Sequence, residues 1–165
     1  GPKARHVLGA HYEVLKSLGH RFTCHPLDVP AAIDKLRQEL EAEKTYHRDT
    51  TSKLAGMHAD ALLHRATGDL VIEQFDGVEL ETLKAIAKQV VSRPNAVALL
   101  ASRTPEGCEV FVTRHPDSRF DCGRLVKEVA RLANGKGGGR PEHGAGRLPP
   151  EADWLRLLEE QGICR

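Results

Sequence analysis

The pattern of hydrophobic and polar positions divides the chain into a helical first part and a mixed second part. Residues 3–18 carry apolar side chains at helical spacing, and Gly19 is expected to end this first helix. A second helix is predicted from Asp28, a candidate N-cap, to about Ala66. At about 1.5 Å per residue it would span roughly 55 Å, more than twice the length of the first helix. The first helix therefore cannot cover the second along its whole length.

One face of the second helix repeats at steps of four and three residues, the spacing of a coiled-coil seam. The seam is polar at its centre and apolar near both ends, where its main members are Val29, Ile33, Leu36, Leu40, Leu54 and Met57. We expect these residues to form a dimerisation surface. One end of the helix would pack on the first helix or on the globular part, and the other would be open to a second copy or to a nucleic-acid backbone. The alternative is a bent or broken pair of helices folded onto the globular part.

After Asp69 the period of the pattern changes. It predicts a strand at 69–75, an amphipathic helix at 79–91 and two strands at 96–101 and 109–114, joined by a hairpin turn at 104–107. Asp121 is expected to cap a helix, and a last helix should turn Trp154, Leu155 and Leu158 inward. The predicted fold class is α/β, a small sheet covered by helices and preceded by a long helical hairpin. The expected division is a hairpin over 1–67 and a globular domain over 68–165.

A glycine-rich run follows the helix capped by Asp121 and reads GKGGGRPEHGAGR over 135–147. Because glycine lacks a Cβ, we expect a loop over 135–146 that turns successive N–H groups toward an anion such as phosphate. The residue after Lys136 is a glycine, so no hydroxyl is present for the magnesium of a nucleotide-hydrolysing P-loop. The alternative is a mobile connector, which would not need the charges.

Charge is local rather than global in this chain. The net charge is +1, but the stretch from Arg119 to Arg147 contains seven basic and three acidic residues. Aromatic residues make up 4% of the chain, which argues against recognition of unpaired bases by stacking. Any nucleic-acid contact should therefore be to phosphates. The predicted phosphate-binding residues are Lys136, Gly137, Gly138, Gly139, Arg140, Arg147, Arg124, Lys127 and Arg131.

The sequence gives little support to metal binding or catalysis. His20, Cys24 and His25 lie close together, yet a closed zinc site needs four ligands and a fourth cannot be named. Neither a Ser/His/Asp nor a Cys/His arrangement can be assembled, so we expect no catalytic residues, metal or cofactor. The cysteines at 24, 108, 122 and 164 lack C-x-x-C spacing, and no apolar run is long enough to cross a bilayer. A cytoplasmic protein with free thiols is predicted.

The helix carrying Leu125, Val126, Val129 and Leu132, followed by NGKGGGRPE at 134–142, resembles the C-terminal DHH-associated domain of alanyl-tRNA synthetases and of the longer alanyl-tRNA editing proteins. The likeness is of the C-Ala type and covers nearly all of 3–150. It departs from the synthetase pattern over 143–149. It departs from the related phosphodiesterases at Arg140, where they place a histidine. The H-x-x-x-H motif of the editing domains and the Asp-His-His cluster of the phosphodiesterases are absent.

The resemblance implies a non-catalytic module that binds tRNA, expected to be alanine tRNA, and self-associates through its long helix. The catalytic and editing domains of such a protein are missing from this chain. Two other readings stay open: a substrate-binding lobe of a phosphoesterase that acts on nucleotides or single-stranded nucleic acid, and a purely structural dimerisation module.

Overall fold

The computed structural model describes residues 1–66 and 68–163. The chain forms two compact units, Gly1–Asp49 and Thr50–Arg165. The second unit begins inside the long helix, whereas the sequence suggested a division at 67/68. The reason is that the last turns of this helix contribute Ala55, Ala59 and Leu62 to the hydrophobic core of the sheet.

The first unit contains α1 (Pro2–Phe22), the short 3-10 helix η1 (Pro26–Asp28) and the first turns of α2 (Val29–Arg65). Contrary to expectation, Gly19 does not end α1; the helix ends at Phe22, and its C-cap Thr23 adopts a left-handed conformation (φ 52°). Gly19 lies inside the helix, and a Cβ there would come within 2.8 Å of the carbonyl oxygen of Cys24. The glycine thus lets the chain fold back tightly after the helix. Asp28 lies in η1, directly before α2.

Helix α2 is continuous over 37 residues, close to the predicted length. Its buried stripe in the second unit is not the predicted seam. Leu54 and Met57 are 49% and 72% exposed, whereas Ala55, Ala59 and Leu62 are buried. The core selects the face with two alanines because small side chains let the helix lie close to its neighbours. In the first unit Val29 is buried, while Leu36 and Leu40 are about half exposed.

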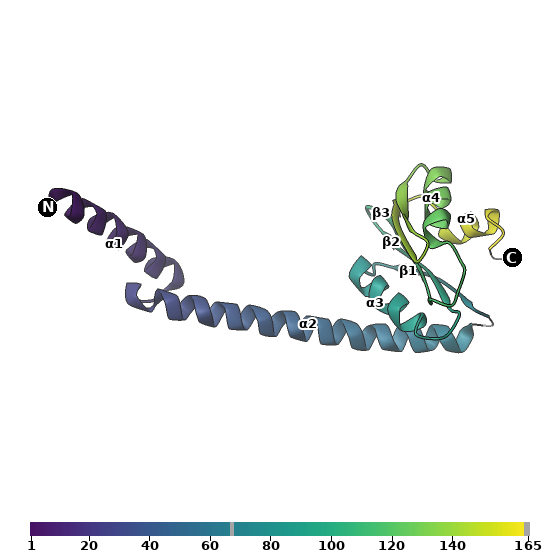
Figure 1. Cartoon of the computed structure of the whole chain (residues 1–165), viewed down its shortest axis with the longest axis horizontal. Helices are drawn as coiled ribbons and strands as arrows, with labels where there is room; N and C mark the ends of the chain where they lie inside the picture. The colour runs from purple at the N-terminus through teal and green to yellow at the C-terminus, as the bar shows by residue number, and fades with distance from the viewer. Residues whose placement is uncertain (67, 164–165) are drawn as a thin grey trace. The chain divides into compact units, whose positions relative to one another are not determined.

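A five-stranded sheet forms the centre of the second unit (Figure 1). Its strands are β1 (Leu70–Asp76), β2 (Val97–Thr104), β3 (Gly107–Arg114), β4 (Lys136–Arg140) and β5 (His143–Leu148). They lie in the order β1-β2-β3-β5-β4, with β1 parallel to β2 and all other pairs antiparallel. Helix α3 (Leu80–Val90) is the crossover between the two parallel strands. The α+β architecture agrees with the predicted fold class.

Both faces of the sheet carry a hydrophobic core. On one face α4 (Cys122–Leu132) and α5 (Trp154–Glu160) pack on β2, β3 and β5, with Trp154 donating a hydrogen bond to the carbonyl of Leu99 at 3.4 Å. On the other face α3 and the last turns of α2 pack on β1, β2 and β3. Trp154 and Leu158 face inward as predicted, but Leu155 is 45% exposed. Its position on the helix turns it away from the sheet.

Candidate nucleic-acid interface

The glycine-rich run forms a β-hairpin, not the expected loop. Strands β4 and β5 pair from Lys136 opposite Arg147 to Arg140 opposite His143, with Pro141 and Glu142 in the turn. Among the described residues, the glycines with positive φ are Gly77, Gly107 and Gly162, none of which belongs to this run. The expectation of a loop that turns successive N–H groups toward an anion is therefore wrong. The backbone of the run is extended and most of its polar groups serve the ladder between strands.

Three glycines of the hairpin face α4 and allow it to approach. A Cβ at Gly137, Gly144 or Gly146 would lie 2.8, 2.9 or 3.1 Å from the side chain of Val126. Gly123 of α4 meets the backbone of Gly139 in the same way, at 2.7 Å. The glycines are thus explained by close packing of a helix on a hairpin.

The opposite face of the hairpin is cationic. Side chains alternate along a strand, so Lys136, Gly138 and Arg140 point away from α4, together with their cross-strand partners Arg147, Ala145 and His143. A Cβ added at Gly138 would meet no atom within 4 Å. We call Lys136, Arg140, His143 and Arg147, together with Gly138 and Ala145 between them, the cationic face. All four of its basic residues are exposed.

The cationic face is open because the helices on its side of the sheet lie elsewhere. Helix α3 packs on β2 and β3, and α4 is the helix that packs on β4 and β5, from the other side. The pair of Lys136 and Arg147 is separated from the pair of Arg140 and His143 by four residues along the strand, about 13 Å. The small residues between the two pairs leave a flat floor on which a polyanion could lie.

The structure does not bring all the predicted cations onto one surface. Arg124, Lys127 and Arg131 are exposed on α4, on the other side of the sheet from the cationic face. The guanidinium of Arg131 pairs with Glu128 at 3.1 Å. These three residues are near the glycine-rich run in the sequence, but the sheet separates them from the cationic face.

An acidic residue lies at the border of the cationic face. Glu106, in the turn between β2 and β3, accepts from the guanidinium of Arg147 at 2.9 Å. The two side chains are 81% and 52% exposed. A ligand phosphate would compete with this carboxylate for Arg147.

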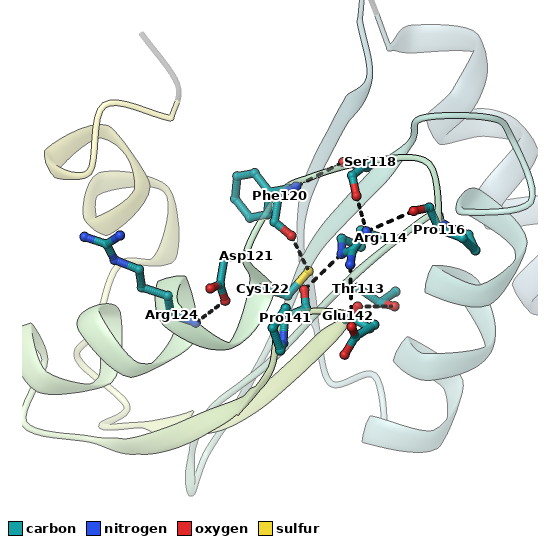
Figure 2. A network of polar contacts seen from close by, with 10 residues as sticks. All are labelled: Thr113, Arg114, Pro116, Ser118, Phe120, Asp121, Cys122, Arg124, Pro141 and Glu142. Atoms are coloured by element: carbon teal, nitrogen blue, oxygen red, sulfur yellow. Dashed lines mark hydrogen bonds and ion pairs between the residues drawn. The ribbon is translucent and has the colours of Figure 1, made fainter.

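The turn of the hairpin is fastened to both β3 and α4 (Figure 2). The carbonyl of Pro141 accepts from the N–H of Cys122 at 3.1 Å, and the carbonyl of Glu142 accepts from the N–H of Arg114 at 3.2 Å and from the Thr113 hydroxyl at 3.3 Å. Asp121 caps α4 as predicted, by accepting from the N–H of Arg124 at 2.9 Å. The hairpin is therefore held at its turn as well as along its length.

Sequence reasoning missed three residues of this region: Glu106, Arg114 and His143. A hairpin with a two-residue turn at Pro141 and Glu142 would have placed His143 beside Arg140, since directly opposite residues of two paired strands share a face. Glu106 contacts Arg147 across 41 positions and Arg114 contacts Pro141 across 27 positions, and no local pattern reveals such contacts.

The buried thiols lie beneath the hairpin and are poor candidates for nucleophiles. Burial raises the pKa of the Cys108 thiol, and burial raises the pKa of the Cys122 thiol to about 11 despite the charge of Arg114. Both thiols are therefore neutral near pH 7, whereas a nucleophilic cysteine needs its thiolate. Cys164 lies outside the described residues.

The described residues contain neither a cluster of metal ligands nor a membrane-spanning helix. No three side chains of His, Cys, Asp or Glu gather into a potential metal site over 1–66 and 68–163. No helix in that part of the chain is long and apolar enough to span a membrane.

The second unit is thus an α+β domain with a crossover helix and with α4 packed on a glycine-rich hairpin. The model of the DHHA1 domain matches residues 67–160, and the chain belongs to this family. An alanine–tRNA ligase of a Synechococcus species is 28% identical over 98% of this chain and 20% of its own length. One of Archaeoglobus fulgidus is 27% identical over 81% of this chain and 15% of its own length. The chain thus spans about a fifth or less of these relatives.

A solved structure shares the fold. The C-Ala domain of alanyl-tRNA synthetase from Aquifex aeolicus superposes with a TM-score of 0.51 at 21% identity, over 56% of this chain and 86% of that domain.

Proposed function

We propose that this chain is a non-catalytic RNA-binding module that holds the phosphates of a tRNA on the cationic face of β4 and β5. The observation that carries the proposal is the open sheet face on which Lys136, Arg140 and Arg147 surround a floor of Gly138 and Ala145. Basic side chains on a flat, small-residue surface can approach a phosphate backbone without reading bases. Membership in the DHHA1 family, and relatives that are alanine–tRNA ligases, favour a tRNA, with alanine tRNA as the first candidate.

In this proposal the module belongs to a larger protein that charges tRNA with alanine or proofreads it. The chemistry would lie in domains outside this chain, and the module would orient the RNA toward them. The side chains of two strands contact phosphates here, in place of the backbone N–H groups suggested by the glycine run. The purpose of the glycines is to bring α4 close to the hairpin.

The first prediction tests whether the cationic face binds tRNA. Replacing Lys136, Arg140 and Arg147 together by alanine should weaken binding of folded alanine tRNA by at least tenfold. The slope of log K against log salt should fall in magnitude by about two to three, since three cations are removed and each phosphate contact releases about one counterion. Binding is measured by titration at two salt concentrations.

The matched control replaces Arg124, Lys127 and Arg131 by alanine. It removes the same charge from the other side of the sheet. If both triple variants lose binding equally, affinity follows total charge and the cationic face is not the site. A dinucleotide that binds better than tRNA would favour the lobe of a phosphoesterase.

Self-association is a second proposed role, and a specific observation favours it. In the first unit Val7, Leu8, Tyr12, Leu36 and Leu40 are each more than half exposed. Apolar side chains concentrated in this way on one part of a chain are typical of a surface that another copy or another protein covers. No contact with RNA is needed for this role.

A further inference from the structure

The side chain of Arg114 is the centre of the polar network at the end of the hairpin (Figure 2). Its Nε donates to the carbonyl of Pro141 at 3.1 Å. Its Nη1 donates to the carbonyls of Pro116, at 3.1 Å, and Ser118. Its Nη2 lies 3.6 Å from a carboxylate oxygen of Glu142.

These contacts separate Arg114 from the other arginines near the hairpin. Its side chain is only 14% exposed, whereas that of Arg147 is 52% exposed. Its donors are directed to four acceptors of the protein, so few remain for a ligand. Arg114 therefore has the environment of a structural guanidinium, not of a phosphate ligand.

The acceptors come from two segments that lie far apart in the sequence. Pro116 and Ser118 belong to the connection between β3 and α4, and Pro141 and Glu142 form the turn between β4 and β5. Arg140 and His143 flank this turn directly. A guanidinium that holds the turn thus fixes the point from which the side chains of Arg140 and His143 project.

We propose that Arg114 is a positioning residue of the RNA interface, which it orders by locking the hairpin turn against β3 and the segment before α4. This inference rests on the function proposed above. Only arginine suits the role, because its planar fork reaches several acceptors at once. Lysine offers a single ammonium on a flexible chain.

The experiment compares wild type with Arg114→Lys, Arg114→Met, Arg140→Ala and the double variant of Arg114→Lys with Arg140→Ala. The probe is folded alanine tRNA. Arg114→Lys keeps the charge, yet it should weaken binding about tenfold, the equivalent of one charge-assisted hydrogen bond. Arg114→Met should weaken it equally. In the Arg140→Ala background, Arg114→Lys should add less than twofold, because the group it positions is already absent.

A second variant covers the case in which the arginine variants do not fold. Thr113→Val removes the hydroxyl that also holds the carbonyl of Glu142, and it changes no charge. It should weaken tRNA binding about threefold, as expected for one neutral hydrogen bond. Arg156→Lys, which alters an exposed pair with Glu160 on α5, is the control and should bind like wild type.

The outcomes separate the two proposals. If wild type does not bind tRNA, the proposed function fails and the inference fails with it. If wild type binds and Arg114→Lys binds equally well, only the inference is overturned. It is also overturned if Arg114→Met alone loses binding, or if the losses from Arg114 and Arg140 add fully, since both results indicate that Arg114 contacts phosphate itself.

Discussion

At the scale of single residues, the formal charges of this chain overstate what a ligand can use. Arg147 is paired with Glu106, and Arg131 with Glu128. Such exposed pairs contribute only about 0–1 kcal/mol to stability. They therefore cost little to break, but each one reduces the net attraction for a polyanion at that point. Among the described residues, Lys136 and Arg140 are the cations of this face that have no carboxylate partner.

A residue-scale prediction follows for Glu106. Changing Glu106→Gln should tighten tRNA binding by about two- to fivefold at low salt, because Arg147 would no longer be shared with a carboxylate. The measurement is the titration used for the triple variants. The matched control is Glu128→Gln on α4, which frees Arg131 on the other side of the sheet. Equal gains in both variants would attribute the effect to net charge and not to the cationic face.

At the scale of elements, the close packing of the hairpin and α4 explains where each of them has its glycines. The hairpin has glycines where α4 approaches, and α4 has Gly123 where the hairpin approaches. A glycine in a strand normally weakens it, because glycine loses more backbone entropy on folding than other residues and has no side chain to pack. Here the loss is compensated by a helix that lies close enough to bury Val126 and Val129 completely.

An element-scale prediction uses two glycines of the same hairpin. Gly144→Ala should destabilise the domain by about 1–3 kcal/mol, because the new Cβ would lie 2.9 Å from both the Cys122 carbonyl and Val126. Gly138→Ala should change stability by less than about 0.5 kcal/mol, since it enters open space with no positive φ. Thermal or denaturant unfolding measures both. Equal losses in the two variants would contradict the account of α4 packing.

The sequence predicted the elements well and their roles less well. Periodicity predicted β1, α3, β2, β3 and α4 to within a few residues, because each has a regular apolar pattern. It did not predict β4 and β5, since a run of glycines carries no side-chain alternation to recognise as a strand. It also did not predict the stripe of α2 that packs on the sheet, because leucine and methionine outweigh alanine in hydrophobicity, whereas close packing favoured Ala55 and Ala59. The seam with Leu54 and Met57 stays a prediction of a dimerisation surface.

At the scale of the whole molecule, the chain combines a packed domain with a helical unit that leaves apolar residues exposed. The family match covers 67–160 and includes the cationic face, whereas the exposed residues Val7, Leu8, Tyr12, Leu36 and Leu40 lie in Gly1–Asp49. The two proposed roles therefore belong to different units. Variants of one unit should leave the role of the other intact.

The prediction at this scale concerns self-association. If the helical unit forms the contact, Leu36→Lys with Leu40→Lys should lower the mass measured by sedimentation toward that of one chain, because charges would replace apolar side chains in the interface. The control is Leu132→Lys, an exposed leucine of α4. Binding of tRNA by each isolated chain should change by less than about twofold, in keeping with independent sites. A wild-type chain that sediments as a monomer would refute the role.

By itself the sequence determined the order of the elements outside the hairpin of β4 and β5, the mixed fold class and the concentration of basic residues around a glycine-rich run. These features depend on local periodicity and composition, which a chain carries without folding. Only the tertiary structure decided which of the basic residues share a surface, why the glycines are there and what holds the hairpin. Strand pairing fixes those properties. It assigns neighbouring residues to opposite faces and brings Arg114 to Pro141, and Glu106 to Arg147, across distances that no local pattern encodes.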